Sequence, residues 1–186
     1  MTLIRASLSF LLAACLVAFP FAAFWFSSFE HPYWLFAAAV ALSILRFATA
    51  GRVATDLLVP QLVFYLGVMA MAFLAAKDQA YLLHPFAMSG SFALIFGISL
   101  SKEQSLIETF ARLREPDLPA SGVVFTRKLT RIWFVFLILN SIVAAITALF
   151  APIEVWVFYN GILFYCLSGV LMVSDFLYRG IFAARA

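Results

Sequence analysis

Charged side chains are scarce in this chain of 186 residues. Twelve Lys and Arg and nine Asp and Glu make up 11% of the positions, less than half of the roughly 25% that is usual in globular proteins. Because 66% of the residues are hydrophobic, a soluble fold could not bury the apolar surface. The net charge is only +3 and there is no basic tail. This argues against nucleic acid as a partner and favours anionic lipid headgroups.

Cysteine is almost absent, which excludes a disulfide framework. Cys15 and Cys166 each lie inside an apolar run, where a thiol behaves as a small hydrophobic group. Two histidines, His31 and His84, precede prolines, and Glu30 adjoins the first. Their spacing does not match a zinc motif. Loop capping or placement at a membrane interface is the better interpretation of both, so we expect no metal site.

Catalytic signatures are also missing. The chain has no Ser-His-Asp order, no glycine-rich phosphate loop and no defensible pair of catalytic carboxylates. We therefore assign no catalytic residue and no cofactor, and nothing in the sequence predicts an enzyme.

Long apolar runs dominate what remains. Each approaches the roughly 20 residues that an α-helix needs to cross a bilayer. The first run, from Leu8 to Phe26, exceeds the 7 to 15 apolar residues of a signal peptide, so we interpret it as an uncleaved helix that Pro20 kinks. We expect an all-α integral membrane bundle of one domain. Its six transmembrane helices are predicted at about residues 8–29, 33–49, 57–76, 81–100, 130–150 and 154–178.

The distribution of positive charge predicts the topology of these spans. Eleven of the twelve Lys and Arg residues fall at alternate helix ends, and only Lys77 falls opposite. The eleven are Arg5, Arg46, Arg52, Lys102, Arg112, Arg114, Arg127, Lys128, Arg131, Arg179 and Arg185. Since short cytoplasmic loops retain positive charge, both termini are expected in the cytoplasm.

The segment 101–128 is the only extended polar stretch, and it falls on the predicted cytoplasmic side. Ser101 and Gln104 have the spacing of a capping box, and apolar residues then recur on one helical face from Leu106 to Leu113. Glu108 and Arg112 have the favoured order of an i,i+4 ion pair. We predict a short amphipathic helix here. It either lies in the bilayer interface or packs on the protein's own spans.

The prolines of residues 115–119 then end this helix. Basic residues follow at the predicted start of the fifth span, where a helix dipole disfavours cations. Topology alone accounts for them, or Glu115 and Asp117 fold back onto Arg127 and Arg131, or the bases hold a lipid phosphate. The candidate functional surface on these grounds consists of Glu115, Asp117, Arg127, Lys128 and Arg131. We expect membrane lipids, and a protein partner docked at residues 101–128, as its ligands.

A few polar side chains fall within the predicted spans. Asn140 and Asn160 either join helices by hydrogen bonds or line a substrate path. Asp175 is the one acidic residue inside an apolar run, and Arg179 lies four positions later, so an ion pair within the helix is expected to reduce the cost of the carboxylate.

The fourth span carries small residues at steps of four. They are Ser89, Ala93, Gly97 and Ser101. A stripe of this kind lets another helix approach closely. It makes Ser89, Ala93 and Gly97 a candidate surface for a homo-oligomer.

The second half of the chain resembles a family of small, uncharacterised bacterial inner-membrane proteins. The similarity is carried by residues 105–113 (SLIETFARL), 115–119 (EPDLP) and 126–128 (TRK), by Trp133 and Asn140, and by Trp156 to Gly161. A more distant similarity, in the spacing of residues 106–107, 118–119 and 133–136, is to the intracellular septation protein A family, from which the basic Arg127 and Lys128 depart.

Members of the first family are commonly encoded beside genes for aryl-polyene pigments and related acyl chains. The resemblance therefore implies a bacterial inner-membrane location and an accessory or scaffolding role in cell-envelope or acyl-lipid biogenesis. The alternative is a lipid-handling transporter or membrane enzyme that uses the basic cluster to bind a phosphate headgroup or an acyl-carrier partner. A polar cavity joining Asn140 and Asn160 would favour that alternative.

Overall fold

The computed structural model describes residues 2–26, 33–49, 55–113 and 115–183. Side chains are described throughout these ranges except at residues 2–10, 13, 33, 46–49, 55–58, 76–78 and 175–183. The elements in chain order are α1 (Thr2–Phe26), α2 (Tyr33–Thr49), α3 (Thr55–Ala76), the 3₁₀-helix η1 (Lys77–Leu83), α4 (His84–Leu100), α5 (Leu106–Arg112), α6 (Ala120–Phe150), α7 (Ile153–Val157), the π-helix η2 (Phe158–Leu163) and α8 (Phe164–Ala183). All of the regular structure described is helical, which confirms the predicted all-α class.

Within the described residues, three helical segments are long and apolar enough to cross a membrane: Gln79–Leu100, Ala120–Phe150 and Ile153–Ser174. Shorter apolar helices cover Ala14–Phe26, Trp34–Leu45 and Val59–Ala75. The protein is therefore a helical protein compatible with a membrane.

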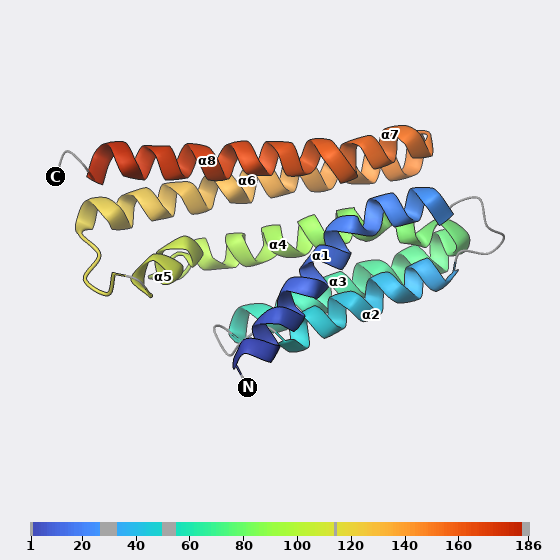
Figure 1. The fold of residues 1–186 in the computed structure, drawn as a ribbon, viewed down its shortest axis with the longest axis horizontal. Coiled ribbons are helices and arrows are strands. Elements are labelled where there is room, and N and C mark those ends of the chain that lie inside the picture. The colour runs from blue at the N-terminus through green and yellow to red at the C-terminus, as the bar shows by residue number, and fades with distance from the viewer. Residues whose placement is uncertain (1, 27–32, 50–54, 114, 184–186) are drawn as a thin grey trace.

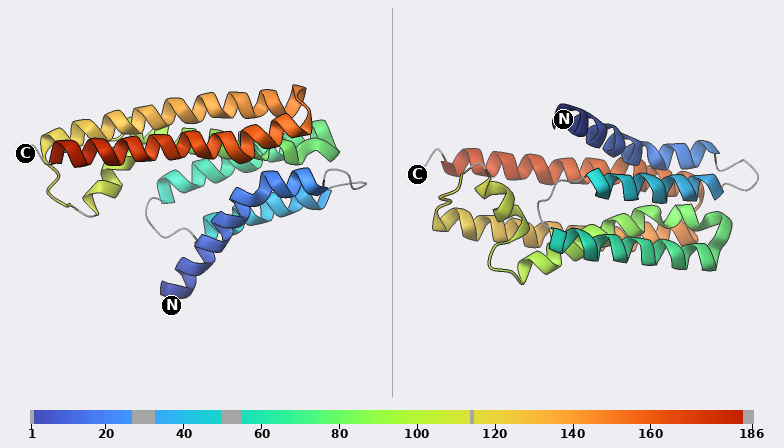
Figure 2. Two further views of the ribbon diagram at one scale, coloured as in Figure 1. Left: turned by 45° about the horizontal axis from the view of Figure 1, so that its top comes forward. Right: turned by 90° about the horizontal axis from the view of Figure 1, so that it is seen from below.

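Helix α4 occupies the centre of the bundle. It packs against α3 on one side and against α6 on the other, while α1 pairs with α2. After a turn at α7, the chain returns through η2 and α8 alongside α6 (Figure 1). One end of the molecule holds α5, the start of α6 and the end of α8, and the starts of α1 and α3 point toward that end without reaching it (Figure 1, Figure 2).

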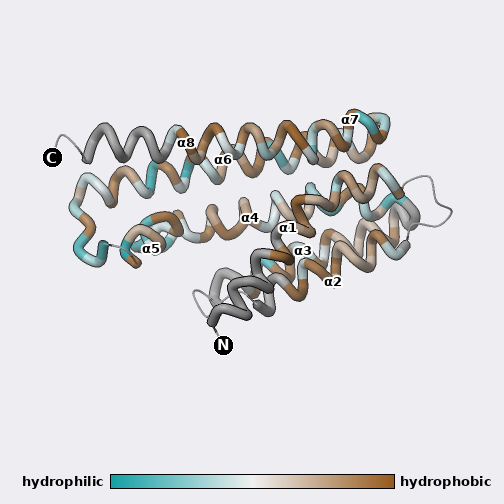
Figure 3. Tube along the Cα trace, in the orientation of Figure 1, coloured by the Kyte–Doolittle hydropathy of each residue, from teal (hydrophilic) through white to brown (hydrophobic). Residues whose placement is uncertain are grey.

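The outer faces of the helices are apolar, and polar side chains are buried in the interior together with apolar ones. Apolar side chains remain exposed along the outer faces of α6 and α8, among them Leu139, Ile146 and Val170, and much of both helices is coloured as hydrophobic in Figure 3. Polar side chains are buried between the helices. These include Ser43, Gln61, His84, Ser89, Ser91, Ser99, Asn140, Ser141, Thr147 and Asn160. Large exposed apolar surfaces mark contact with a membrane or a partner. Hydrogen-bonding groups that lie in hydrocarbon must pair within the bundle, which is consistent with the burial of polar side chains between the helices.

Helix boundaries differ most from the prediction at α6. The sequence predicts a helix from residue 130, whereas α6 begins at Ala120 and has 31 residues. At a rise of 1.5 Å per residue it is about 46 Å long, more than the roughly 30 Å of bilayer hydrocarbon. The apolar run marked only the part of the helix that matches hydrocarbon, so the prediction placed Arg127 and Lys128 at the helix start. In the structure they lie two turns inside the helix.

The fourth and sixth predicted spans are each divided by a change of helix type. Residues 77–83 form a 3₁₀-helix before α4 begins at His84, with Pro85 in its first turn, a position where a missing N–H costs nothing. In the sixth span, residues 158–163 form a π-helix between α7 and α8. π-Helical turns are rare and are often found at functional sites.

Candidate functional site

Helix α5 lies against α6 and closes one end of the α4–α6 pair. We call residues 101–131, which connect these two helices, the junction. Ser105 is the N-cap residue, and its N–H donates to Glu108 Oε2 at 3.4 Å. The predicted cap at Ser101 and Gln104 is therefore wrong, since both residues are exposed and lie before the helix. The N–H of Ile107 donates to Thr130 Oγ1 at 3.4 Å, which ties α5 to α6.

The predicted ion pair within α5 is confirmed. Arg112 lies 2.9 Å from Glu108 Oε1 through Nη2, and its Nη1 donates to the carbonyl oxygen of Pro116 at 3.0 Å. Glu108 is 2% exposed, so its charge is shielded from water and held by Arg112 and the Ser105 N–H. Arg112 thus fixes both α5 and the turn that follows it.

Arg127 joins α6 to the end of α4. Its guanidinium donates to the carbonyl oxygens of Leu100 at 3.3 Å, Lys102 at 2.6 Å and Glu103 at 2.9 Å. These carbonyls lie at and just beyond the last turn of α4, where helical carbonyls lack partners and a cation is favoured by the dipole. The side chain therefore has a structural role, and both of its terminal nitrogens bind carbonyl groups.

The other members of the predicted surface do not pair as expected. Glu115, Asp117, Lys128 and Arg131 are exposed, and Glu108–Arg112 is the ion pair found among the residues whose side chains are described. The proposed folding of Glu115 and Asp117 onto Arg127 and Arg131 is therefore wrong. Backbone carbonyl groups, which no sequence motif marks, orient Arg127 in place of carboxylates.

Apolar side chains are exposed on the same junction. Phe110 is 53% exposed, Leu113 67% and Val124 70%. Hydrophilic residues of the α5–α6 connection adjoin them (Figure 3). An apolar face beside charge at the end of a bundle is typical of a helix in the bilayer interface. The packing alternative is confirmed in part, because α5 contacts α6 and Glu108 is buried. Placement of the exposed Phe110 and Leu113 in a bilayer interface stays a prediction.

Asn140 connects three helical elements in the interior. Its Nδ2 donates to Ser89 Oγ of α4 at 2.7 Å, and its Oδ1 accepts from the Tyr159 hydroxyl of η2 at 3.0 Å. It is 3% exposed. The amide is therefore engaged at both ends, as expected of a residue that joins helices.

Asn160 is engaged at one end only. Its Nδ2 donates to the carbonyl oxygen of Trp156 at 2.9 Å and to Thr147 Oγ1 at 3.3 Å. Its Oδ1 is buried without a hydrogen-bond partner. A buried acceptor left unpaired costs about 1 to 3 kcal/mol, so a hydrogen-bond donor that reached this oxygen would be stabilised there.

His84 is a residue whose place the sequence did not indicate. It was expected at an outer loop or interface, but it is 4% exposed at the start of α4. Its Nδ1 lies 2.8 Å from the Tyr65 hydroxyl of α3, and its ring lies 4.6 Å from that of Phe19. Neither Tyr65 nor Phe19 stands at a spacing that would have revealed this contact, because α1, α3 and α4 meet only in the folded bundle.

A cavity of about 260 Å³ lies among α1, α4, α6, η2 and α8. Its polar lining residues are His84, Ser89, Asn140, Asn160 and Tyr165. The remaining lining is apolar and includes Leu16, Phe92, Leu137 and Phe164. The structure thus brings Asn140 and Asn160 to one cavity.

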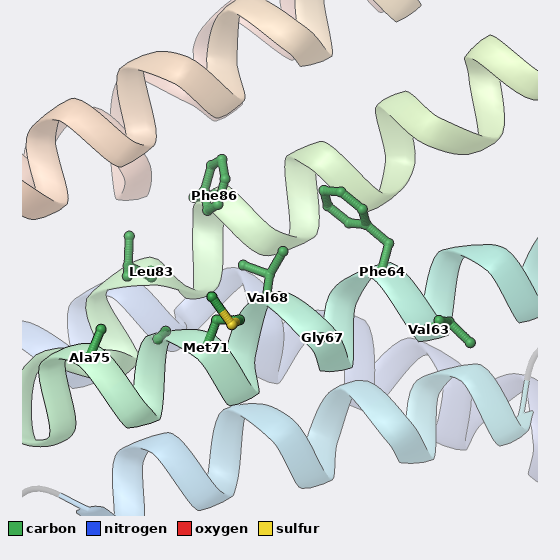
Figure 4. A pocket seen from close by; sticks show the side chains of 9 residues that line it. Val63, Phe64, Gly67, Val68, Met71, Ala75, Leu83 and Phe86 are labelled. Atoms are coloured by element: carbon green, nitrogen blue, oxygen red, sulfur yellow. The ribbon is translucent and has the colours of Figure 1, made fainter.

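A larger hollow of about 590 Å³ lies between α3 and α4. Its walls include Val63, Phe64, Met71 and Phe86 (Figure 4). No side chain lining it carries a charge or a hydrogen-bonding group. It offers apolar contact alone and no chemistry.

The small-residue stripe of α4 packs within the chain. Ser89 and Ala93 are buried, and a Cβ atom on Gly97 would lie 2.8 Å from the ring of Phe134 in α6. The close approach that the stripe predicts is therefore made by α6. Self-association through Ser89, Ala93 and Gly97 stays a prediction, and it would require α6 to move.

The predicted pair Asp175–Arg179 lies outside the residues whose side chains the structure describes. No protein-family model, curated protein or solved structure matches the chain.

Proposed function

We propose that this is a multi-pass protein of the bacterial inner membrane, with six spans and both termini in the cytoplasm. The support is of two kinds. The helices run back and forth so that the starts of α1, α3 and α6 and the end of α8 all point toward the end that holds α5 (Figure 1). Eleven of the twelve Lys and Arg residues belong to that side in the sequence pattern.

The first prediction concerns this topology. A phosphatase that is active only in the periplasm, fused after Gly122, is expected to be inactive, while a fusion within the connection at residues 151–152 is expected to be active. Enzyme activity in cells, normalised to fusion abundance, makes the measurement. Activity at Gly122 would contradict the six-span arrangement.

We propose an accessory or scaffolding role in cell-envelope or acyl-lipid biogenesis, exercised through the junction at the cytoplasmic face. The resemblance of residues 105–133 motivates the pathway. The choice of this site rests on one observation. Helix α5 is held firmly against α6, and the junction exposes both the apolar Phe110 and Leu113 and the cations Lys128 and Arg131. We infer that this surface lies against anionic headgroups, where apolar burial and charge attraction add.

The second prediction separates this role from folding. Lys128 and Arg131 make no hydrogen bond or ion pair among the described side chains, so changing both to Gln is expected to leave membrane abundance nearly unchanged. Loss of two surface cations should weaken attachment of the junction to anionic lipid by about 2 kcal/mol. Two measurements test this prediction. One is complementation of a deletion strain, and the other is the protection of Phe110→Cys from reaction with a water-soluble maleimide.

The matched control is Glu115→Gln with Asp117→Gln, which removes two exposed charges of the opposite sign from the same junction. This variant is expected to complement fully and to protect Phe110→Cys at least as well as the parent. If the Lys128, Arg131 variant complements fully and Phe110→Cys stays equally protected from maleimide, these basic residues serve only to set the topology.

The second candidate function is lipid handling within the membrane, as a transporter or membrane enzyme. A specific observation favours it: Asn140 and Asn160 line one cavity with apolar walls, and Asn160 Oδ1 has no partner. The observation supports binding of a lipid segment and names no reaction. Both terminal nitrogens of Arg127 bind carbonyls of the α4 end, so the exposed Lys128 and Arg131 are the better candidates for binding a phosphate headgroup.

A further inference from the structure

We propose that the cavity among α1, α4, α6, η2 and α8 binds an uncharged lipid whose polar head carries a hydroxyl group, such as a long-chain alcohol or a monoacylglycerol. The inference rests on the second candidate function, lipid handling, and names its ligand class. Four features of the cavity support it.

The first feature is an acceptor with a fixed orientation. The Nδ2 group of Asn160 is held by Trp156 and Thr147, so the amide cannot rotate without losing both bonds. This leaves Oδ1 as the group available on a side chain that is 3% exposed and lines the cavity. An amide oxygen accepts hydrogen bonds only, so the ligand must supply a donor. The π-helical turn of residues 158–163 is the local distortion in which this side chain sits.

The second feature is a second acceptor. The Tyr65 hydroxyl donates to the carbonyl oxygen of Ala39 at 3.3 Å and lies 2.8 Å from His84 Nδ1. Because the carbonyl can only accept, the Nδ1–H of the neutral imidazole donates to the Tyr65 oxygen, and Nε2 is left as an acceptor. No hydrogen bond reaches Nε2 within the described part of the chain, and His84 lines the same cavity. One hydroxyl group can donate to Asn160 Oδ1, and a head with a second hydroxyl, as in monoacylglycerol, can also donate to His84.

The third feature is the absence of charge. Among the residues that line the cavity there is no Lys, Arg, Asp or Glu. Burying an ionised headgroup without a counter-charge is far more costly than burying a hydroxyl that finds a partner. A phosphate or carboxylate head is therefore disfavoured, and so is a quaternary amine.

The fourth feature is size and access. A cavity of about 260 Å³ is slightly below the 300 to 1,000 Å³ of pockets for drug-sized ligands, so it fits a small head and the first carbons of one chain. Val17 and Phe92 line it and are also 44% and 41% exposed. They place its mouth on the apolar outer surface, through which the rest of the chain can extend into the bilayer.

The test uses the full-length protein in lipid nanodiscs with three photoactivatable diazirine probes of equal chain length: an alcohol, a carboxylate at pH 8 and an alkane. Labelled peptides are identified by mass spectrometry. The alcohol is expected to label the peptides around residues 84–92 and 160–165 at least tenfold more than the other two. Monoacylglycerol should compete, and Asn160→Leu should reduce alcohol labelling about tenfold.

The matched control is Gln61→Leu, which replaces a buried side-chain amide of α3 that does not line the cavity. It is expected to retain the preference for alcohol over alkane. The comparison of probes on the unchanged protein needs no variant, so a folding defect in Asn160→Leu does not obscure the result.

Equal labelling of the cavity by alcohol and alkane, or stronger labelling by the carboxylate, would overturn the ligand class while leaving lipid handling supported. Absence of labelling there by all three probes would overturn lipid handling itself, together with this inference.

Discussion

Replacing Gly97 with leucine is expected to separate α4 from α6 and to destabilise the protein by about 2 kcal/mol. A Cβ atom at this position would already lie 2.8 Å from Cε2 of Phe134, and the rest of the leucine side chain extends further into the ring. Forcing extra carbons into a packed contact typically costs 1 to 3 kcal/mol. The measurement is resistance to unfolding in mixed micelles as the proportion of denaturing detergent rises.

Gly169→Leu is the matched control for this prediction. No atom lies within 4 Å of a Cβ at Gly169, so the same change in α8 meets open space and is expected to be neutral. Restoring room through Phe134→Ala in the Gly97→Leu background should recover part of the lost stability, since contacting residues couple. If both glycine variants unfold at the same detergent fraction, the contact of α4 with α6 does not limit stability.

Replacing Arg127 with glutamine is expected to loosen the junction by about 2 kcal/mol. The guanidinium binds three carbonyls just past the last turn of α4, from Leu100 to Glu103. Hydrogen bonds from charged groups are each worth about 1.5 to 3 kcal/mol when shielded; two of these three are exposed to solvent, which lowers their sum. Hydrogen–deuterium exchange of residues 101–113, with detergent unfolding as the global readout, measures the effect.

Lys128→Gln serves as the control, because it removes the same charge from the adjacent exposed position. It is expected to leave exchange of α5 unchanged. Arg127→Lys keeps the charge but lacks the planar fork that reaches several carbonyls, so an intermediate result is expected. Equal exchange in all three variants would show that Arg127 does not hold the junction together and serves only as a positive charge that sets the topology.

Helix type and approximate helix positions were predictable from the sequence. The spacing of Pro, Gly and charged residues between apolar runs placed α2 and α3 within two residues of their bounds, Tyr33–Thr49 and Thr55–Ala76. The i,i+4 pair Glu108–Arg112 followed from helical periodicity alone. These features depend on neighbours close in the chain, and local chemistry is what a sequence displays directly.

The start of α6 was not predictable in this way. Hydropathy reports where a helix meets hydrocarbon, whereas the helix continues through Ala120 to Lys128 because backbone hydrogen bonds and α5 support it outside the apolar run. The partners of Arg127 are backbone carbonyls, which every residue possesses. No residue type could therefore mark them, and the expected acidic partners Glu115 and Asp117 were the wrong ones.

The sequence by itself determined that the chain is helical, that its helices are apolar enough for a membrane, and that polar groups such as Asn140 and Asn160 lie within them. Only the tertiary structure decided which of those groups are satisfied. Asn140 and Asn160 are the same residue type in similar apolar surroundings, yet the first meets Ser89 and Tyr159 while the second keeps an unpaired oxygen beside His84 in one cavity. Hydrogen-bond partners 19 to 51 residues away are set by how the helices cross. The small-residue stripe marked Gly97 as a point of close approach, but no local pattern identified Phe134 of α6 as the residue that meets it.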